Sequence, residues 1–432
     1  MPRSTAPDTA PAAPGAAAAG AAVVGSTVAP AEVPASTPGS RPSLGQVLDF
    51  AWGRGPFTAT EAMAGASLTR STTIDAIDTL VEAGVVQELP NARDAGEYSA
   101  GRPARRFELP ADLGAVIALD AGDTHLGVTV TDLARTPLAR VRADLDPQHT
   151  VGQRRAAILK HLDAALTTSG VPRDRVLALC AGVAAPVARN GSSPPHPDGF
   201  WERTNPGLAE LLAGWAPVVE IKNDAVLAAA AEGDLGEAVG CRDYIALIAG
   251  ERFGAGAVVD GHILHGAHGG VGEMVLFDHV RGVDSADGLG PTITRIAGEL
   301  LASGEASADG ALAHLAPEGL KADRVLALAA AGDADAALVV RDAGAFLARV
   351  VAVLGSTYDP ERVIVCGAIA EAIEPVLDAA RDVLRPLLDL PAPAILRSRL
   401  GADIVLAGAV STALASARTV GLPRLVAQRL KG

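Results

Sequence analysis

The spacing of apolar residues changes at about residue 113. Beyond it, short runs rich in branched apolar residues alternate with longer stretches rich in Ala and Leu. The short runs predict strands at residues 115–120, 126–131, 176–183, 218–221, 244–248, 255–259, 363–365 and 404–407. The longer stretches predict helices, for example at 154–166, 225–231 and 337–354. Strands that alternate with helices indicate an α/β fold with at least two subdomains.

Residues 44–109 show a different pattern. Apolar residues repeat with helical spacing in three short segments, at Leu44, Val47 and Leu48, within residues 60–64, and at Ile74, Ile77, Leu80 and Val81. Gly84 follows the third segment, where a glycine commonly ends a helix. Residues 85–87 and 105–109 then predict two strands around a polar turn. Three helices followed by a β-hairpin predict a winged helix-turn-helix.

Half of residues 1–42 are Ala or Pro, and this segment has almost no charge and no apolar period. A segment of this composition cannot bury enough apolar surface to offset the entropy lost on ordering, so it predicts a disordered tail. The predicted organisation is therefore a tail at 1–42, a winged helix-turn-helix domain at 43–112 and an α/β domain at 113–432.

Charge and composition narrow the class of protein. The chain has 36 Lys+Arg against 50 Asp+Glu, a net charge of −14, which argues against binding to nucleic acid or membranes through overall charge. A small basic site is still compatible with this balance. The sequence has no uninterrupted apolar run of about 18 residues, so no membrane span is predicted. Cys180, Cys241 and Cys366 lie in or beside apolar runs, which indicates free thiols in a reducing cytoplasm.

Two segments of the predicted winged helix-turn-helix carry groups that suit DNA. The first turn of the third helix faces the major groove in this motif, and here it carries small hydroxyl side chains and an arginine. Residues 101–106 form the densest positive cluster of the chain, and an arginine there would suit a narrow minor groove. The candidate DNA-binding residues are Thr69, Arg70, Ser71, Thr72, Arg102 and Arg105. Alternatively, the hydroxyl groups cap the helix and the arginines lie in a solvated turn.

Several segments of the α/β domain carry residue types that bind polar ligands. The first strand leads into Asp120-Ala-Gly-Asp-Thr124, where small residues let backbone amides approach phosphate oxygens. Asn223 and Asp224 follow the strand at 218–221, a position suited to a catalytic Asp. A glycine-rich segment then leads to Glu273, and a later strand at 363–365 ends in a glycine turn.

In this order and at these distances, the segments resemble the ROK family, which includes bacterial sugar kinases and sugar-responsive repressors. Residues 68–72 and 101–103 resemble its repressor branch. The resemblance implies a two-lobed, actin-like ATPase (ribonuclease H-like) fold with sugar in the cleft. It implies sugar binding by Asn223, Asp224 and Glu273, with Asp224 as the general base in kinases. The positions that correspond to phosphate loops are Asp120, Gly122, Thr124, Gly250 and Gly254.

The sequence departs from the kinases of this family at both phosphate loops. The second loop carries Glu251 and Arg252 between its glycines, which puts bulk and a carboxylate where backbone amides would meet polyphosphate. In the first loop Asp123 replaces a Gly and His125 replaces a Lys. Repulsion between these carboxylates and ATP disfavours phosphoryl transfer, because that reaction depends on positioning and charge neutralisation.

The zinc site of the family is also absent from the sequence. It needs a His three residues beyond the Glu and three clustered cysteines, whereas Glu273 is followed by Met-Val-Leu-Phe277 and then by the single later cysteine Cys366. No metal site is therefore predicted. Trp201 and Trp215 belong to a region that borders the cleft by resemblance. They are either sugar-stacking residues or buried packing anchors.

Together these features predict a cytoplasmic transcriptional regulator, and they favour a repressor over an activator. It would bind operator DNA as a homodimer or homotetramer and sense a sugar or sugar derivative, without a cofactor and without efficient phosphoryl transfer. One alternative is an ATP-dependent carbohydrate kinase that uses Asp224 as general base. Another is a regulator that has lost its response to ligand.

Overall fold

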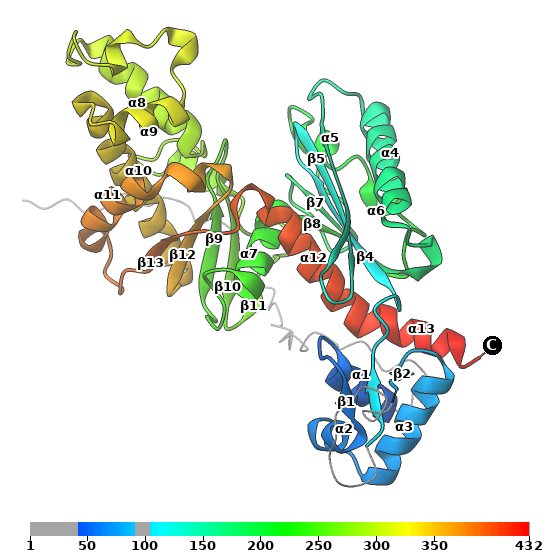
Figure 1. Cartoon of the computed structure of the whole chain (residues 1–432). Helices are drawn as coiled ribbons and strands as arrows, with labels where there is room; N and C mark the ends of the chain where they lie inside the picture. The colour runs from blue at the N-terminus through cyan, green and yellow to red at the C-terminus, as the bar shows by residue number, and fades with distance from the viewer. Residues whose placement is uncertain (1–41, 91–103, 432) are drawn as a thin grey trace, which may run out of the picture. The chain divides into compact units, whose positions relative to one another are not determined.

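The computed structural model describes residues 42–90 and 104–431 (Figure 1). The predicted tail, apart from Pro42, and the candidate residue Arg102 lie outside the described residues.

Residues 42–90 and 104–108 contain three helices and a small sheet. The helices are α1 (Pro42–Ala51), α2 (Ala59–Gly65) and α3 (Arg70–Glu82), and the sheet has the strand order β1 (Phe57–Thr58), β3 (Arg106–Glu108), β2 (Gln87–Glu88). Thr58 begins α2 through reciprocal hydrogen bonds with Glu61, which satisfy amides at the helix start. Phe57, Ile77 and Phe107 belong to one buried core. The elements follow the predicted order of three helices and a strand pair, with β1 added.

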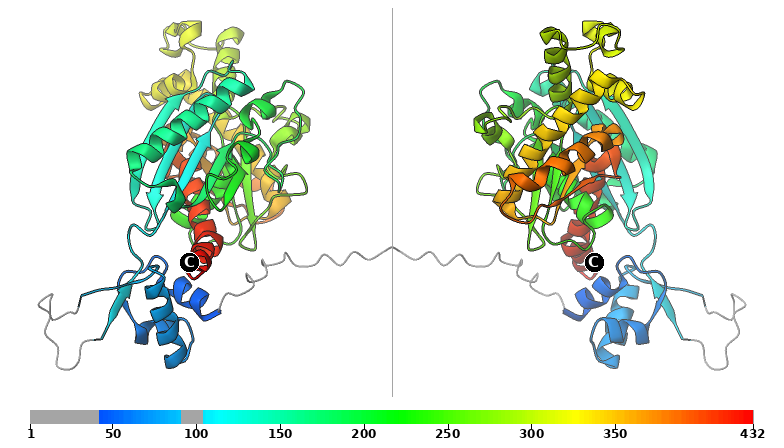
Figure 2. Two further views of the ribbon diagram at one scale, coloured as in Figure 1. Left: turned by 90° about the vertical axis from the view of Figure 1, so that its right-hand side faces the viewer. Right: turned by 90° about the vertical axis from the view of Figure 1, so that its left-hand side faces the viewer.

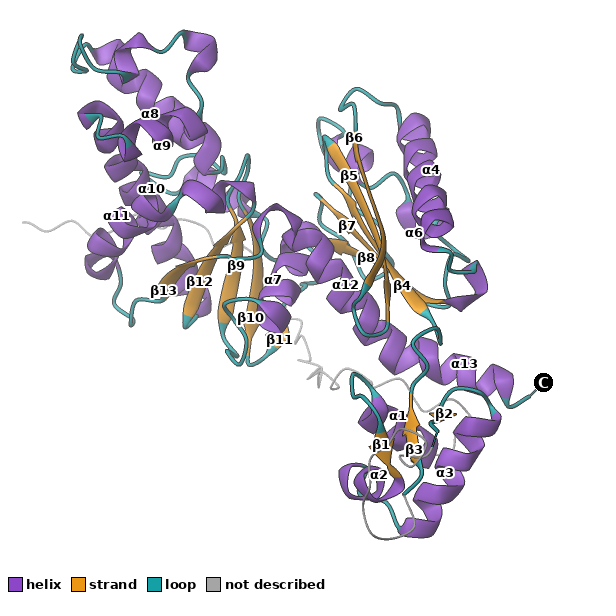
Figure 3. Cartoon of the chain, viewed as in Figure 1, coloured by secondary structure: helices purple, strands orange, loops and turns teal. Residues whose placement is uncertain are grey.

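Beyond residue 108, the described chain contains two five-stranded sheets with the same topology (Figure 3). The first contains β4 (Ala115–Ala121), β5 (His125–Asp132), β6 (Pro137–Asp144), β7 (Val176–Val183) and β8 (Val219–Asn223). The second contains β9 (Tyr244–Ile248), β10 (Gly254–Val259), β11 (His262–Ile263), β12 (Arg362–Cys366) and β13 (Ala394–Arg397). In each sheet three antiparallel strands come first, and two strands parallel to the first one follow. This repeated sheet is the actin-like ATPase fold that the sequence predicts.

Helices pack on both faces of the two sheets (Figures 1 and 2). On the first sheet, one face is covered by α4 (Val151–Ser169), α5 (Phe200–Thr204) and α6 (Leu208–Leu211). Beside the second sheet lie α8 (Leu289–Ser303), α9 (Ala322–Ala330), α10 (Ala334–Tyr358) and α11 (Glu374–Leu384). Between the sheets lie α7 (Asp224–Leu235) and α12 (Ile404–Ser416), which contact each other.

Two glycines let α7 pack closely on both sides. A Cβ atom on Gly408 of α12 would lie 1.9 Å from the carbonyl oxygen of Leu227, and one on Gly256 of β10 would lie 2.1 Å from that of Ala225. Any side chain at either position would collide with the backbone of α7. These glycines therefore allow α7 to lie close to α12 on one side and to β10 on the other.

One predicted strand is wrong, because residues 404–407 begin helix α12. The buried residues of α12 include Ile404, Val405 and Leu406 in succession, so the segment shows no clear helical stripe. A short apolar run of this kind has the same sequence pattern in a buried strand and in a buried helix. The predicted strands also omit β1, β6, β11 and β13.

A π-helical turn at Ala417–Gly421 joins α12 to α13 (Leu422–Arg429). The continuous helix Gly401–Arg429 is long and apolar enough to cross a membrane, but 61% of its apolar window is buried inside the protein. Its hydrophobicity is explained by packing between the sheets. The three cysteines are free thiols, with Cys180 and Cys366 buried and Cys241 half-buried.

Candidate functional site

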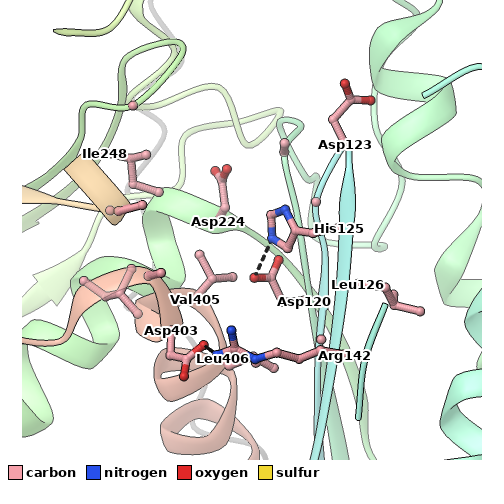
Figure 4. A pocket seen from close by; sticks show the side chains of 18 of the residues that line it. Asp120, Asp123, His125, Leu126, Arg142, Asp224, Ile248, Asp403, Val405 and Leu406 are labelled. Carbon is pink, nitrogen blue, oxygen red and sulfur yellow. Dashed lines mark hydrogen bonds and ion pairs between the residues drawn. The ribbon is translucent and has the colours of Figure 1, made fainter. Parts of the chain in front are cut away.

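A cavity of about 580 Å³ lies between the two sheets. Its walls come from the β4–β5 hairpin, the start of α7, the segments after β9 and β12, and the first residues of α12 (Figure 4). Asp120, Gly122, Asp224 and Gly250 line it, so residues from both predicted phosphate loops share one cavity with the predicted general base. Thr124 and Gly254 are not among its lining residues.

His125 fills the space over the first glycine loop (residues 121–124). A Cβ atom on Gly122 would lie 2.1 Å from Cε1 of the His125 ring, so the ring rests directly on this glycine. His125 Nε2 lies 3.1 Å from Oδ2 of Asp120 (Figure 4). This hydrogen bond raises the pKa of His125. A phosphate that approached the loop at Gly122 would have to displace the ring.

Arg154 of α4 holds the same loop through its carbonyl groups. Its guanidinium donates to the carbonyl oxygen of Asp123 at 3.0 Å and to that of Gly122. Only 1% of Arg154 is exposed, and burial lowers its pKa. Sequence reasoning missed this residue, although a signal exists. Arg154 shares one helical face with the buried Ile158 and Leu162, where an arginine is unexpected.

The second glycine loop (residues 249–254) meets the start of α8 through backbone hydrogen bonds. The amides of Gly288, Leu289 and Gly290 donate to carbonyl oxygens of residues 249–251 over 2.8 to 3.1 Å. Pro291, which follows, has no amide hydrogen. The first turn of a helix binds anions because its amides lack partners within the helix. In α8 these amides already have partners in the second glycine loop.

Asn223 and Asp224 lie where β8 meets α7. Oδ1 of Asn223 accepts hydrogen bonds from the first amides of α7, and Nδ2 donates to the carbonyl of Ala185 at 3.1 Å. The amide group of Asn223 therefore has a structural role as a helix cap. Asp224 lines the cavity, and its pKa rises to about 7 through burial and the nearby charges of Asp120 and Glu273. Burial also raises the pKa of Glu273.

Glu273 precedes the segment that replaces the zinc motif. This segment, the 3₁₀ helix Met274–His279, is anchored by Phe277, whose ring packs edge-to-face on Phe253 with centroids 5.9 Å apart. Phe253 also stacks on Phe346 of α10 at 6.0 Å. Within residues 42–90 and 104–431, no three His, Cys, Asp or Glu side chains gather as metal ligands. Aromatic packing holds this segment in place.

The predicted DNA-binding residues of α3 lie at its exposed start. Thr69 is the N-cap, and its Oγ1 accepts from the amide of Thr72 at 3.3 Å and lies 2.8 Å from the Thr72 hydroxyl. Capping is thus one role of these hydroxyl groups. Arg70 and Ser71 follow on the exposed first turn.

Arg105 makes contacts inside the protein. Its Nε and Nη2 donate to the two carboxylate oxygens of Glu88 at 2.9 and 2.8 Å, and Nη1 donates to Asp78 Oδ1 at 3.1 Å. The guanidinium carbon also lies 5.0 Å above the ring of Phe107. Hydrogen bonding to Arg105 lowers the pKa of Glu88.

The two tryptophans of the predicted cleft region differ in burial. Trp215 is buried in a core, and the guanidinium of Arg173 lies over its ring. Trp201 is half-buried, and its ring lies beside that of His196.

Residues 116–415 match the ROK family, which is more than half of the chain. The chain belongs to the ROK family. Its fold is similar to that of a ROK family transcriptional regulator described as a homologue of the E. coli MLC protein. That structure has a TM-score of 0.70 and 20% identity, and the alignment covers 89% of this chain and 98% of the other.

Kinases of the ROK family are also similar to this chain. A ROK glucokinase from Streptomyces griseus, solved with glucose and AMPPNP, has a TM-score of 0.54 and 25% identity over 69% of this chain and 99% of its own. A bifunctional NanE/NanK enzyme from Brucella suis is 34% identical over 198 residues, which are 45% of this chain and 34% of the enzyme. The chain thus spans about a third of the length of the curated relatives that it matches.

Proposed function

We propose that this ROK protein is a transcriptional regulator, and that it acts as a repressor rather than as an activator. It binds operator DNA through residues 43–112 and senses a sugar or sugar derivative in the cleft, without efficient phosphoryl transfer. The observation that carries this proposal is that protein groups occupy the first phosphate loop and the amides at the start of α8, which faces the second loop. His125 rests on Gly122, and the second glycine loop takes the first amides of α8.

This occupation disfavours ATP in two ways. A phosphate bound at Gly122 would have to displace the His125 ring, and one bound at the start of α8 would have to break backbone hydrogen bonds to the second glycine loop. Each buried amide or carbonyl that loses its partner costs about 1 to 3 kcal/mol. A polyphosphate would also meet the carboxylate of Asp123, which lines the cavity and stands where the kinases have a glycine. Phosphoryl transfer depends on the opposite arrangement, in which amides and cations surround the phosphates.

The N-terminal elements support the DNA-binding part of the proposal. The first turn of α3 presents Arg70 and Ser71 to solvent, as a recognition helix must. A regulator of this kind acts in the cytoplasm and binds repeated half-sites as a homodimer or homotetramer. The similarity to the MLC homologue spans 89% of this chain, so it extends beyond the ROK region into these elements.

One continuous helix connects the cleft with the N-terminal helices α1 and α3. Residues 404–406 of α12 line the cavity. Further along, Arg418 donates to Asp49 of α1 at 2.8 Å, and Arg429 of α13 donates to the carbonyls of residues 83 and 84 at the end of α3. A ligand that moves α12 would therefore act on α1 and α3. A coupling of roughly 1 to 3 kcal/mol is typical of such regulation.

The proposal is tested with the full chain and a pool of random DNA duplexes. The wild-type protein is expected to enrich a defined sequence, and Arg70→Ala to weaken its binding by roughly 1 to 3 kcal/mol if the arginine reads a base. Arg54→Ala is the matched control, since it removes the same charge outside α3. Failure of the wild-type protein to enrich any duplex would contradict the DNA-binding function.

The kinase alternative rests on Asp224, whose raised pKa of about 7 suits a general base. ATP-dependent phosphorylation across a broad sugar panel, followed by product analysis, decides between the two functions. We expect no turnover. Phosphorylation that disappears in Asp224→Ala would establish the kinase. If the protein binds DNA but no sugar changes its thermal midpoint or its DNA affinity, it is a regulator without ligand response.

A further inference from the structure

We propose that Arg105 is a positioning residue, which fixes the β2–β3 pair against α3, and that it does not contact DNA. This inference rests on the proposed DNA-binding function and assigns a different role to one residue of that site. It starts from the hydrogen bonds of a single side chain that reaches three elements.

The guanidinium of Arg105 donates from all three of its nitrogen atoms to side chains of the protein itself. Two parallel bonds join it to Glu88 of β2, and a third joins it to Asp78 in the middle of α3. Its flat face lies on Phe107, the residue of β3 that is buried in the core with α3. A planar fork held on two edges and one face has little freedom to turn toward another partner.

The charge of this cluster also opposes contact with phosphate. One guanidinium faces two carboxylates, so the three side chains together carry a charge of about −1 at neutral pH. To reach a phosphate, Arg105 would have to leave Asp78 and Glu88, whose charges would then face the DNA without a counter-ion. By contrast, Arg70 is exposed on the first turn of α3, and within residues 42–90 and 104–431 no ion pair or side-chain hydrogen bond holds it.

The cluster of Arg105, Asp78 and Glu88 contributes little to the stability of the fold. All three side chains are 39 to 49% exposed, and exposed ion pairs contribute little to folding. Their geometry is more informative, because Asp78 belongs to α3, the proposed recognition helix, and Glu88 belongs to β2 of the neighbouring strand pair. Arg105 joins them and so sets the orientation of the strand pair relative to the recognition helix.

The two roles of Arg105 predict opposite effects for Glu88→Ala. If Arg105 contacts DNA, this change frees the guanidinium and removes a negative charge near phosphate, so binding becomes tighter. If Arg105 positions the strand pair, the same change releases the pair and weakens binding. Glu82→Ala removes one carboxylate from the exposed end of α3 without touching the cluster. It is the matched control and should leave binding unchanged or slightly tighter.

The experiment measures the affinity of full-length variants for the duplex that the wild-type protein enriches, over a series of salt concentrations. We expect Glu88→Ala and Arg105→Ala each to weaken binding roughly 3- to 30-fold, which lies within the range of coupling between contacting residues. The slope of log affinity against log salt should stay as in the wild type. Thermal midpoints show that each variant is folded.

Two results would overturn the inference while leaving the DNA-binding function in place. One is that Glu88→Ala binds as tightly as the wild type or more tightly. The other is that Arg105→Ala lowers the salt slope by about one, the signature of a lost phosphate contact. If the wild-type protein enriches no duplex, the proposed function itself fails, and the role of Arg105 fails with it.

Discussion

Asp224 is held at the cavity where ionisation is unfavourable. The folded protein keeps its proton up to a pKa of about 7, whereas an unfolded chain releases it near the ordinary value of 3.8. The folded state therefore loses stability as pH rises from about 4 to 7. Asp224→Asn removes this penalty, so the variant should be more stable than the wild type at pH 8, by at most about 4 kcal/mol, and the difference should shrink at pH 5.

Thermal midpoints of both proteins at pH 5 and pH 8 test this expectation. Asp144→Asn is the matched control, because Asp144 lines the same cavity from the edge strand β6 but is exposed to solvent. A gain for Asp224→Asn that is equal at both pH values would show that the carboxyl ionises normally in the folded protein.

At the residue scale, the sequence identifies residue types that suit a site, but it does not identify the side chains with which they form hydrogen bonds. Among the residues predicted for ligand and phosphate binding, Asp120, Gly122, Gly250 and Asp224 line one cavity, whereas the cavity lining does not include Thr124, Asn223, Gly254 and Glu273. Arg105 was nominated for its charge, yet its partners Asp78 and Glu88 lie 27 and 17 residues away. Such distant contacts depend on how the strand pair folds onto α3, which residue spacing does not encode.

At the scale of elements, the segment after Glu273 depends on aromatic packing. Phe277 is 1% exposed and contacts Phe253, which stacks on Phe346 of α10. Phe277→Ala should lower the free energy of unfolding by about 3 to 5 kcal/mol, because it leaves a cavity among these rings. Chemical denaturation of the variant beside the wild type measures the loss.

Leu276→Ala provides the matched control for this change. Leu276 is the neighbouring residue but is 59% exposed, so its truncation should alter stability by less than about 0.5 kcal/mol. A chelator should leave the wild-type midpoint unchanged. A large chelator effect, or equal losses for both variants, would contradict the role assigned to Phe277.

The predictability of each element follows from its burial. Strands β7 and β9 match their predicted bounds because each is a compact apolar run between polar turns. Residues 404–407 were misassigned because α12 is buried on most sides and loses its helical stripe. The edge strands β6 and β13 were missed since only part of each is buried, which weakens the apolar signal.

At the scale of the whole chain, α12 and α13 connect the cleft with α3. Arg429→Ala should preserve ligand binding, because this residue lies far along the helix from the cavity, but it should reduce the effect of ligand on DNA affinity. The ligand is any sugar that raises the thermal midpoint of the wild type. DNA affinity with and without that sugar, for wild type and variant, measures the coupling.

Arg424→Ala is the control on the same helix. Arg424 donates to the carbonyl of Pro217 beside the first sheet, so its loss removes an α13 arginine without releasing α3. A ligand effect on DNA affinity that is full in Arg429→Ala, or equally reduced in both variants, would contradict transmission through the contact at the end of α3.

The burial of the cysteines provides a built-in reporter of unfolding. Burial raises the pKa of the Cys180 and Cys366 thiols far above that of a solvated cysteine, whereas Cys241 is only half-buried. A thiol-specific dye should therefore modify one cysteine per native chain and three per unfolded chain. Because Cys180 belongs to the first sheet and Cys366 to the second, mass analysis of the labelled peptides would show which sheet opens first under denaturant.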